Sequence, residues 1–290
     1  MFVQEDILSK RKVFGTFRMF VGRLIEYFYG PYIKMKRDAE INNVYISRYP
    51  GNLLNQAQVD ELESYQCDTI ELDSRRSFFE SNHKDGTLEN TFYGSIIPLV
   101  RKVIKTGSVS KVLNIGCSYD YPDCVLAEEF GEVNFLGIDF PRNIEQINHG
   151  LTRNNFKVKS GYALNLLKNK NIQSDLTYFS STANNIRNAE LQEYIKELST
   201  VSKNIIFNEP FWLQPHKDKN PKALDSEASE VGHIYYDKLT GKIGYVSYNH
   251  NYAGLLERCG YKVTYYKTFK TDTFIDSIQM GRIQVIAEKI

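Results

Sequence analysis

The 290-residue chain lacks the features that mark disulfide-rich, metal-binding or nucleic-acid-binding proteins. Its four cysteines are scattered and include no Cys-x-x-Cys pair, which favours reduced thiols over a disulfide framework or a zinc site. The net charge is only +1, which argues against a chain-wide surface for nucleic acid. Internal repeats and low-complexity tracts are absent as well. We therefore predict a cytoplasmic protein without a metal ion and without a nucleic-acid partner.

The stretch KVLNIGCSYDYPDCV, residues 111–125, lacks the glycines of a dinucleotide-binding loop. An apolar run ends at Gly116, and a helix can begin near Pro122. A dinucleotide site requires Gly-x-Gly-x-x-Gly, because the backbone approaches a pyrophosphate and the helix packs closely on the strand. Ser118 and Tyr121 occupy the second and third glycine positions, and no Walker loop is present. This pattern disfavours nicotinamide and flavin dinucleotides.

Residues 1–86 read as an extension that begins with an amphipathic helix. Apolar side chains recur there every three or four residues, and Arg18, Arg23 and Glu26 interrupt them, so the segment cannot cross a bilayer cheaply. One interpretation is a helix that packs on the domain or on the partner subunit of a homodimer. The other is a helix on the inner face of the membrane, where the following basic residues contact anionic headgroups: Lys10, Arg11, Lys12, Lys34, Lys36 and Arg37.

Residues 87–290 alternate between strand and helix patterns. A helix is predicted over 87–107, with a kink at Pro98. Apolar strands are then predicted at 111–115, 133–138, 156–159, 175–179 and 204–208, with helices between most of them. Such a pattern indicates a doubly wound α/β fold with a mostly parallel sheet of seven strands. Two strands near the C-terminus lack an intervening helix and predict a final antiparallel pair, and residues 211–247 read as a polar lid insertion.

S-adenosylmethionine fits the turn after the first strand better than a dinucleotide does. It carries no phosphate, and its carboxylate and amino groups need one sharp turn of backbone. The stretch VLNIGCSYD resembles the first motif of class I S-adenosylmethionine-dependent methyltransferases, with Asn114, Gly116, Ser118 and Asp120 at the four motif positions. Asp139 follows the second strand, as does the family's ribose-binding acidic residue. The resemblance extends over about residues 90–290.

Further stretches of the sequence match the family's later strands. VKSGYALNLL resembles the third-strand motif, in which Tyr162 takes the place of the family's adenine-binding Asp, so that the Ala163 amide and stacking are expected to hold the adenine. SDLTYFSSTANNI resembles the fourth strand, whose end faces the methyl donor. The cofactor-binding residues implied by the resemblance are Asn114, Gly116, Cys117, Ser118, Asp139, Phe140, Tyr162, Ala163, Ser180 and Ser181.

The acceptor of the methyl group is predicted from the bases near the same sheet edge. A hydroxyl needs a base to remove its proton, and His250 in YNHNYAGLL resembles a motif of some bacterial sugar O-methyltransferases. Glu209, at the end of the fifth strand, and His233, on the lid beside Tyr235 and Tyr236, complete the predicted catalytic set. The alternative for His250 is a structural role as an N-capping or surface histidine, and the alternative for Glu209 is an ordinary ion pair.

The predicted function is therefore O-methylation of a sugar or glycan hydroxyl, on a lipid-linked or surface glycan. Two alternatives stay open: methylation of another small molecule, and a catalytically silent scaffold that only binds S-adenosylmethionine. The departures from the motifs at Asn114, Ser118 and Tyr162 motivate the silent scaffold.

Overall fold

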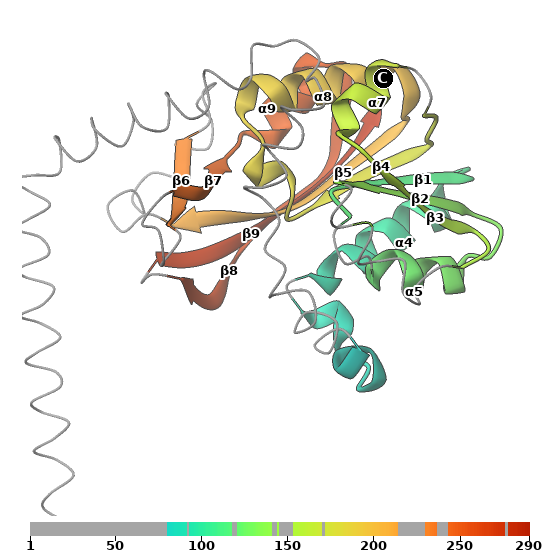
Figure 1. Cartoon of the computed structure of the whole chain (residues 1–290), viewed down its shortest axis with the longest axis horizontal. Helices are drawn as coiled ribbons and strands as arrows, with labels where there is room; N and C mark the ends of the chain where they lie inside the picture. The colour runs from blue at the N-terminus through green and yellow to red at the C-terminus, as the bar shows by residue number, and fades with distance from the viewer. Residues whose placement is uncertain are drawn as a thin grey trace, which may run out of the picture. The chain divides into compact units, whose positions relative to one another are not determined.

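The fold is built around one sheet of seven strands (Figure 1). The computed structural model describes residues 80–91, 93–117, 121–140, 144, 153–169, 172–213, 230–236, 243–275 and 278–290. The strand order is β3-β2-β1-β4-β5-β9-β8. The strands are β1 (Lys111–Ile115), β2 (Asn134–Asp139), β3 (Phe156–Ser160), β4 (Leu176–Ser180), β5 (Asn204–Leu213), β8 (Tyr261–Ile275) and β9 (Ile278–Lys289).

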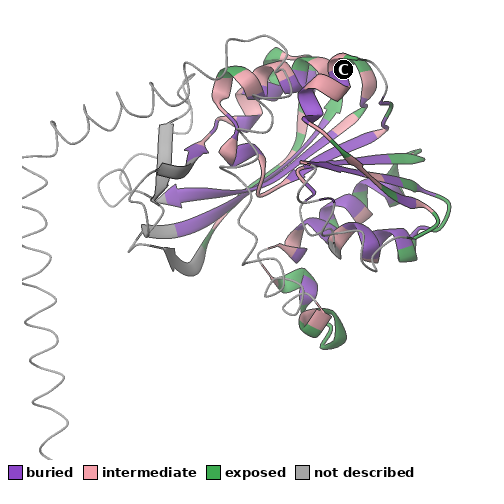
Figure 2. Cartoon of the chain, in the orientation of Figure 1, coloured by how far each residue is buried: buried purple, intermediate pink, exposed green. Residues whose placement is uncertain are grey.

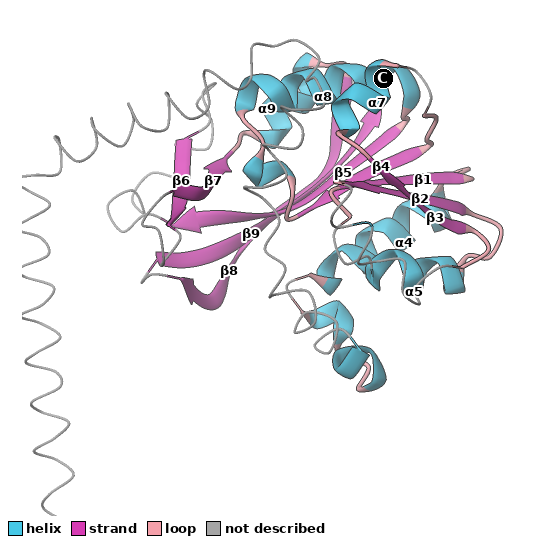
Figure 3. Ribbon diagram, in the orientation of Figure 1, coloured by secondary structure: helices cyan, strands magenta, loops and turns pink. Residues whose placement is uncertain are grey.

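Both faces of the sheet are covered by helices (Figure 3). Helices α4 (Ile97–Thr106) and α5 (Tyr121–Glu129) cover one face, and α7 (Ala163–Lys168), α8 (Asn188–Val201) and α9 (Tyr252–Arg258) cover the other (Figure 1). Strands β1 to β5 pair in parallel, whereas β9 pairs antiparallel with both β5 and β8. The predicted fold class is confirmed, including the final antiparallel pair.

The two-sided cover explains the apolar strands of the sequence. Four of the five residues in β1 and in β4 are buried (Figure 2), because neither face of a covered parallel sheet meets water. On the α4 and α5 face, Ile97, Val100 and Leu126 pack with Tyr178 and Ile206 from the sheet in one hydrophobic cluster. All described residues belong to one compact unit.

Three local predictions differ from the structure. The helix predicted over 87–107 is divided into two short 3₁₀ turns, Leu88–Asn90 and Gly94–Ile96, followed by α4. Pro98 therefore lies in the first turn of α4, where its missing N–H has no intrahelical partner to lose, and it makes no kink. The final strands are longer than predicted, since β8 and β9 together extend over most of the expected polar loop.

The predicted lid, residues 211–247, contains regular structure at both ends. Strand β5 continues to Leu213, and β6 (Glu230–Tyr236) pairs with β7 (Ile243–Asn249) in a second, two-stranded sheet. Residues 214–229 and 237–242 lie outside the described residues.

The predicted N-terminal helix also lies outside the described residues, together with the basic side chains assigned to it. Among the helices that the structure does describe, none combines the length and the apolar character needed to cross a bilayer.

Candidate functional site

The strand register brings the predicted cofactor residues to one edge of the sheet. Ile115 of β1 is level with Ile138 of β2 and with Phe179 of β4. The next residue of each strand, Gly116, Asp139 and Ser180, therefore lies at the shared carboxyl edge. The amides of Gly116 and Cys117 both donate to the Ile138 carbonyl, at 2.8 and 3.2 Å, which ties the turn after β1 to β2. Ligands of open α/β sheets bind at this edge.

Gly116 is required both by its backbone conformation and by its surroundings. Its φ is +74°, in the left-handed region that favours glycine. A Cβ atom at this position would lie 2.2 Å from Cγ2 of Thr182. The Thr182 hydroxyl donates to the Gly116 carbonyl at 3.1 Å. The turn after β1 and the loop after β4 are therefore in direct contact, and Thr182 leaves no room for a side chain at position 116.

Asp139 is held at the end of β2 by its own turn. Its side chain is 8% exposed, and Oδ1 accepts a hydrogen bond from the Phe140 amide at 2.7 Å. The Asp139 carbonyl accepts from the Gly161 amide at 2.8 Å, so the ends of β2 and β3 stay together. Gly161 lies two positions before α7, whose first residue, Ala163, is buried, so this bond also ties the end of β2 to the start of α7. The carboxylate is well placed to accept hydrogen bonds from a diol at the edge.

Asn114 lies in the interior of the sheet. Its Nδ2 donates to Oδ2 of Asp123 in α5 at 2.8 Å, and the Tyr178 hydroxyl donates to the other oxygen of the same carboxylate. All three side chains are buried. The network joins β1, β4 and α5 next to the turn after β1, so Asn114 supports this turn from the interior of the sheet.

Tyr162 contacts an acidic residue that the sequence did not single out. Its hydroxyl donates to Glu190 in the first turn of α8, and its ring meets Tyr194 edge-on at 6.1 Å. Burial raises the pKa of Glu190 to about 7, and the hydrogen bond from Tyr162 partly opposes this rise. The family's acidic residue is absent from position 162, and a carboxyl group from a different helix lies beside it. No sequence pattern relates two residues on separate elements, so this pair was missed.

The loop after β4 begins with an unusual backbone conformation. Ser181 has φ +58°, a conformation that non-glycine residues adopt at a cost of about 1–3 kcal/mol. Its hydroxyl accepts from the buried guanidinium of Arg282 at 3.4 Å, and its amide donates to the Asn208 carbonyl at 3.2 Å. The Ser180 hydroxyl accepts from Nδ2 of Asn208 at 3.3 Å. Strand β5 and strand β9 thus fix the two serines predicted to face the methyl donor.

Glu209 lies behind this loop, fully buried at 0% exposure. Its two oxygens accept from the backbone amides of Thr182, at 3.3 Å, and Asn184, at 3.2 Å. Burial raises the pKa of Glu209 to about 7, and the hydrogen bonds from these amides oppose the rise. The carboxyl group that the sequence placed among the catalytic residues therefore binds the backbone of the loop.

His250 holds the same loop from the side of β7. Its Nε2 lies 3.1 Å from the Ala183 carbonyl and 2.9 Å from the Ile186 carbonyl. Carbonyl oxygens only accept, so Nε2 carries the proton and Nδ1 carries the lone pair. Among the described residues, Nδ1 has no hydrogen-bond partner. The ring is 1% exposed, and burial lowers the pKa of His250 to about 4, so the imidazole is neutral near pH 7.

Two further contacts attach the second sheet to the loop after β4 and to β5. The Ser247 hydroxyl, on β7, accepts from Nδ2 of Asn184 at 2.8 Å and from the indole of Trp212 at 2.7 Å. These residues are far apart in the sequence and belong to no motif, so only the fold brings them together. The His233 backbone pairs with Ser247, and its side chain, like Ser118, lies outside the described part of the chain. The catalytic role predicted for His233 stays a prediction.

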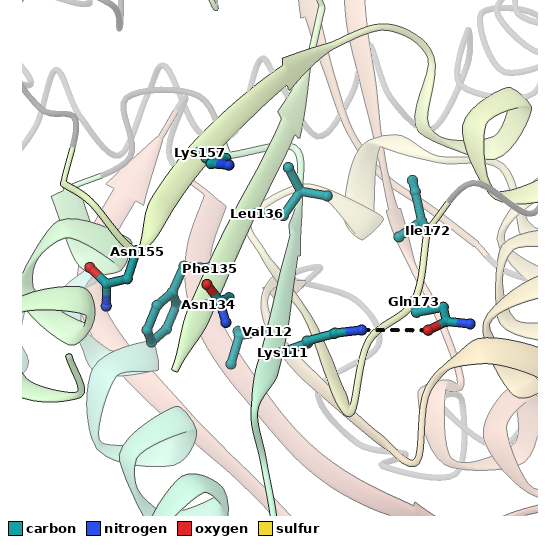
Figure 4. A pocket seen from close by; sticks show the side chains of 9 residues that line it. All are labelled: Lys111, Val112, Asn134, Phe135, Leu136, Asn155, Lys157, Ile172 and Gln173. Carbon is teal, nitrogen blue, oxygen red and sulfur yellow. Dashed lines mark hydrogen bonds between the residues drawn. The ribbon is translucent and has the colours of Figure 1, made fainter. Parts of the chain in front are cut away.

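A hollow of about 490 Å³ opens at the opposite edge of the sheet (Figure 4). It lies at the amino ends of β1 and β2, and Lys111 donates to Gln173 across it at 3.5 Å. Its position, far along the strands from Gly116 and Asp139, separates it from the predicted cofactor edge. In the described ranges, no group of three or more His, Cys, Asp or Glu side chains is arranged to hold a metal ion.

No family model matches the sequence, and neither does any curated protein. Solved structures with a similar backbone include a SAM-dependent methyltransferase from Methanosarcina mazei, at 17% identity over 67% of this chain and 97% of that one, with a TM-score of 0.49. The N-terminal domain of EvdMO1 with SAH bound is 13% identical over 67% of this chain and 81% of that one, with a TM-score of 0.47. The mitomycin 7-O-methyltransferase MmcR is 14% identical over 78% and 60%, with a TM-score of 0.46.

The order and directions of the strands, β3-β2-β1-β4-β5-β9-β8 with β9 antiparallel, are those of the predicted Rossmann-like methyltransferase fold.

Proposed function

We propose that this chain is an S-adenosylmethionine-dependent methyltransferase that methylates a hydroxyl group of a sugar or glycan. The observation that carries the proposal is the geometry at the carboxyl edge. Gly116 lies in a positive-φ turn that has no room for a side chain, and the buried carboxylate of Asp139 ends the adjacent strand. The turn at Gly116 suits the small amino-acid end of the cofactor, and the Asp139 carboxylate suits the two hydroxyls of its ribose.

The residues present at the edge fit this cofactor. The turn at Gly116 would face its methionine end, Asp139 its ribose, and Ser180 and Ser181 its reacting centre. When bound, S-adenosylmethionine supplies a methyl group that its sulfonium already activates for in-line displacement. The chain itself must then align the acceptor, exclude water and remove the proton of the hydroxyl. We assign the removal of this proton to the lone pair on Nδ1 of His250, because the carbonyls bound to Nε2 keep the ring's own proton on Nε2.

The choice of a sugar hydroxyl rests on the sequence. The base candidate lies in YNHNYAGLL, the polar segment before it carries Tyr235 and Tyr236, and the basic N-terminal segment suits a membrane-bound glycan. A screen of activated sugars and glycans is expected to give a mass gain of one methyl group, together with S-adenosylhomocysteine. Binding of the cofactor with no product from any acceptor would favour the silent scaffold. Methylation of non-sugar hydroxyls alone would reject a sugar as the acceptor.

Replacing Asp139 with alanine is expected to weaken the binding of S-adenosylhomocysteine at least tenfold, because two ribose hydroxyls lose a charged acceptor. Isothermal calorimetry measures this directly. Asp139→Asn keeps an oxygen for the Phe140 amide and should fall between the wild type and the alanine variant. Asp85→Ala, at an exposed position outside the sheet, is the matched control. Binding of NAD as tight as that of S-adenosylhomocysteine would contradict the proposed cofactor.

A further inference from the structure

A continuous path of hydrogen bonds connects β5 with the turn after β1 and passes through Thr182. The Thr182 amide donates to Glu209 Oε1 at 3.3 Å, and its hydroxyl donates to the Gly116 carbonyl at 3.1 Å. The Gly116 amide in turn donates to Ile138, one residue before Asp139. Among these residues, Thr182 is the one whose side chain contacts the Gly116 peptide.

The contact is steric as well as polar. The Thr182 side chain occupies the space that a Cβ of Gly116 would fill, with Cγ2 2.2 Å and Oγ1 2.4 Å from that point. The hydroxyl has one proton, and its distance to the Gly116 carbonyl is shorter than its 3.4 Å distance to the Ser180 carbonyl. The Gly116 peptide is therefore restrained both by packing and by a hydrogen bond.

Thr182 itself has little freedom to move. Glu209, fully buried, binds the amides at positions 182 and 184, and His250 donates to the carbonyls at 183 and 186. Both side chains lie in the interior. The loop from 182 to 186 is thus held by donors and acceptors along its whole length, and the Thr182 side chain projects from a fixed backbone.

We propose that Thr182 is a positioning residue that fixes the Gly116 peptide for the methionine end of the cofactor, and that Glu209 acts through Thr182. The proposal rests on the proposed function and adds a residue of the fourth-strand stretch SDLTYFSSTANNI that was not among the predicted site residues. It assigns Glu209 a role in organising the loop, since both carboxylate oxygens are engaged by the backbone. Because Gly116 would face the methionine end and Asp139 the ribose, a change at Thr182 should weaken the binding of the methionine end and leave the binding of the adenosine part unchanged.

The test compares S-adenosylhomocysteine with adenosine, which lacks the methionine end. Thr182→Val keeps the branched shape and removes the hydroxyl. Its affinity for S-adenosylhomocysteine is expected to fall about three- to tenfold, the size of one net hydrogen bond, and its affinity for adenosine to stay within about twofold of wild type. Thr182→Ser keeps the hydroxyl and should retain most of the affinity. Thr106→Val, which removes an exposed hydroxyl bonded within α4, is the control.

The outcomes separate this proposal from the proposed function. Unchanged affinity of Thr182→Val for S-adenosylhomocysteine would overturn the positioning role, and so would an equal loss for both ligands, which indicates collapse of the whole loop. If the valine variant does not fold, Thr182→Ala, which adds no atoms, carries the same expectation. Failure of the wild-type protein to bind either ligand would instead reject the proposed function.

Discussion

Replacing His250 with alanine is expected to lower turnover by about 10²–10⁴-fold, the usual loss when a general base is removed. The affinity for S-adenosylhomocysteine should fall far less than turnover, because the ring contacts the loop after β4 and reaches the turn at Gly116 only through Thr182. The reason for the large effect is the placement of the lone pair. Two carbonyls hold the proton on Nε2, which leaves Nδ1 to accept the proton of the hydroxyl.

Alanine also removes the two hydrogen bonds that hold the loop, so a second variant is needed. His250→Gln retains an N–H donor that can reach the Ala183 and Ile186 carbonyls but has no basic nitrogen. A loss of turnover in both variants supports the assignment of the base. Recovery of turnover in His250→Gln would show that His250 acts only as an anchor and would reject its role as base.

The pH dependence of kcat/KM gives an independent check of the same prediction. Burial lowers the pKa of His250 to about 4, so its neutral form predominates at every pH above that value. The contribution of His250 to the rate should therefore stay level from neutral pH down to about pH 5 and fall as the pH drops through 4. A fall centred near pH 7 would instead match Glu209, whose pKa burial raises to about 7.

Unfolding at low pH must be separated from this effect. The unfolded chain binds a proton at His250 below pH 6.5, the unperturbed pKa, whereas the folded chain resists it down to about 4. Folding stability from this group is thus present above pH 6.5 and is lost as the pH falls. Circular dichroism over the same pH range shows where the chain remains folded.

Replacing Gly116 with alanine is expected to destabilise the protein by about 2–5 kcal/mol and to abolish measurable binding of S-adenosylhomocysteine. A side chain at φ +74° costs about 1–2 kcal/mol by itself. Overpacking against Thr182, whose Cγ2 would lie 2.2 Å from the new atom, adds about 1–3 kcal/mol. Chemical denaturation and calorimetry measure the two effects separately.

Gly260 is a natural control for this substitution. It has a similar φ of +81°, but a Cβ there would meet nothing within 4 Å. Gly260→Ala should therefore show only the smaller backbone cost and no loss of ligand binding. Combining Gly116→Ala with Thr182→Gly should recover part of the stability, because the clash is removed. Simple additivity of the two changes would contradict the contact between them.

The layout of the fold could be predicted from the sequence because its signals are local. The strand at 111–115 carries three apolar residues, Val112, Leu113 and Ile115, since both faces of the parallel sheet are covered. The β5-β9-β8 end of the sheet is marked by two strands without a helix between them. Gly116 and Asp139 could be placed at the sheet edge for the same reason, because the carboxyl ends of parallel strands meet there. Pro98 and the lengths of β8 and β9 were mispredicted, since element boundaries depend on packing as much as on local pattern.

The connections within the site were decided by the tertiary structure alone. Glu209 binds amides 25 and 27 positions away, and His250 binds carbonyls 64 and 67 positions away. The sequence identifies these residues as an acid and a base, but not which oxygen or nitrogen is already occupied. Thr182 lies in the fourth-strand stretch without a predicted role, and it meets Gly116 only because β1 and β4 are neighbours in the sheet. Hydrogen-bond partners depend on positions in space, so a chain's local pattern can name its chemical groups but only the packed fold decides what each of them touches.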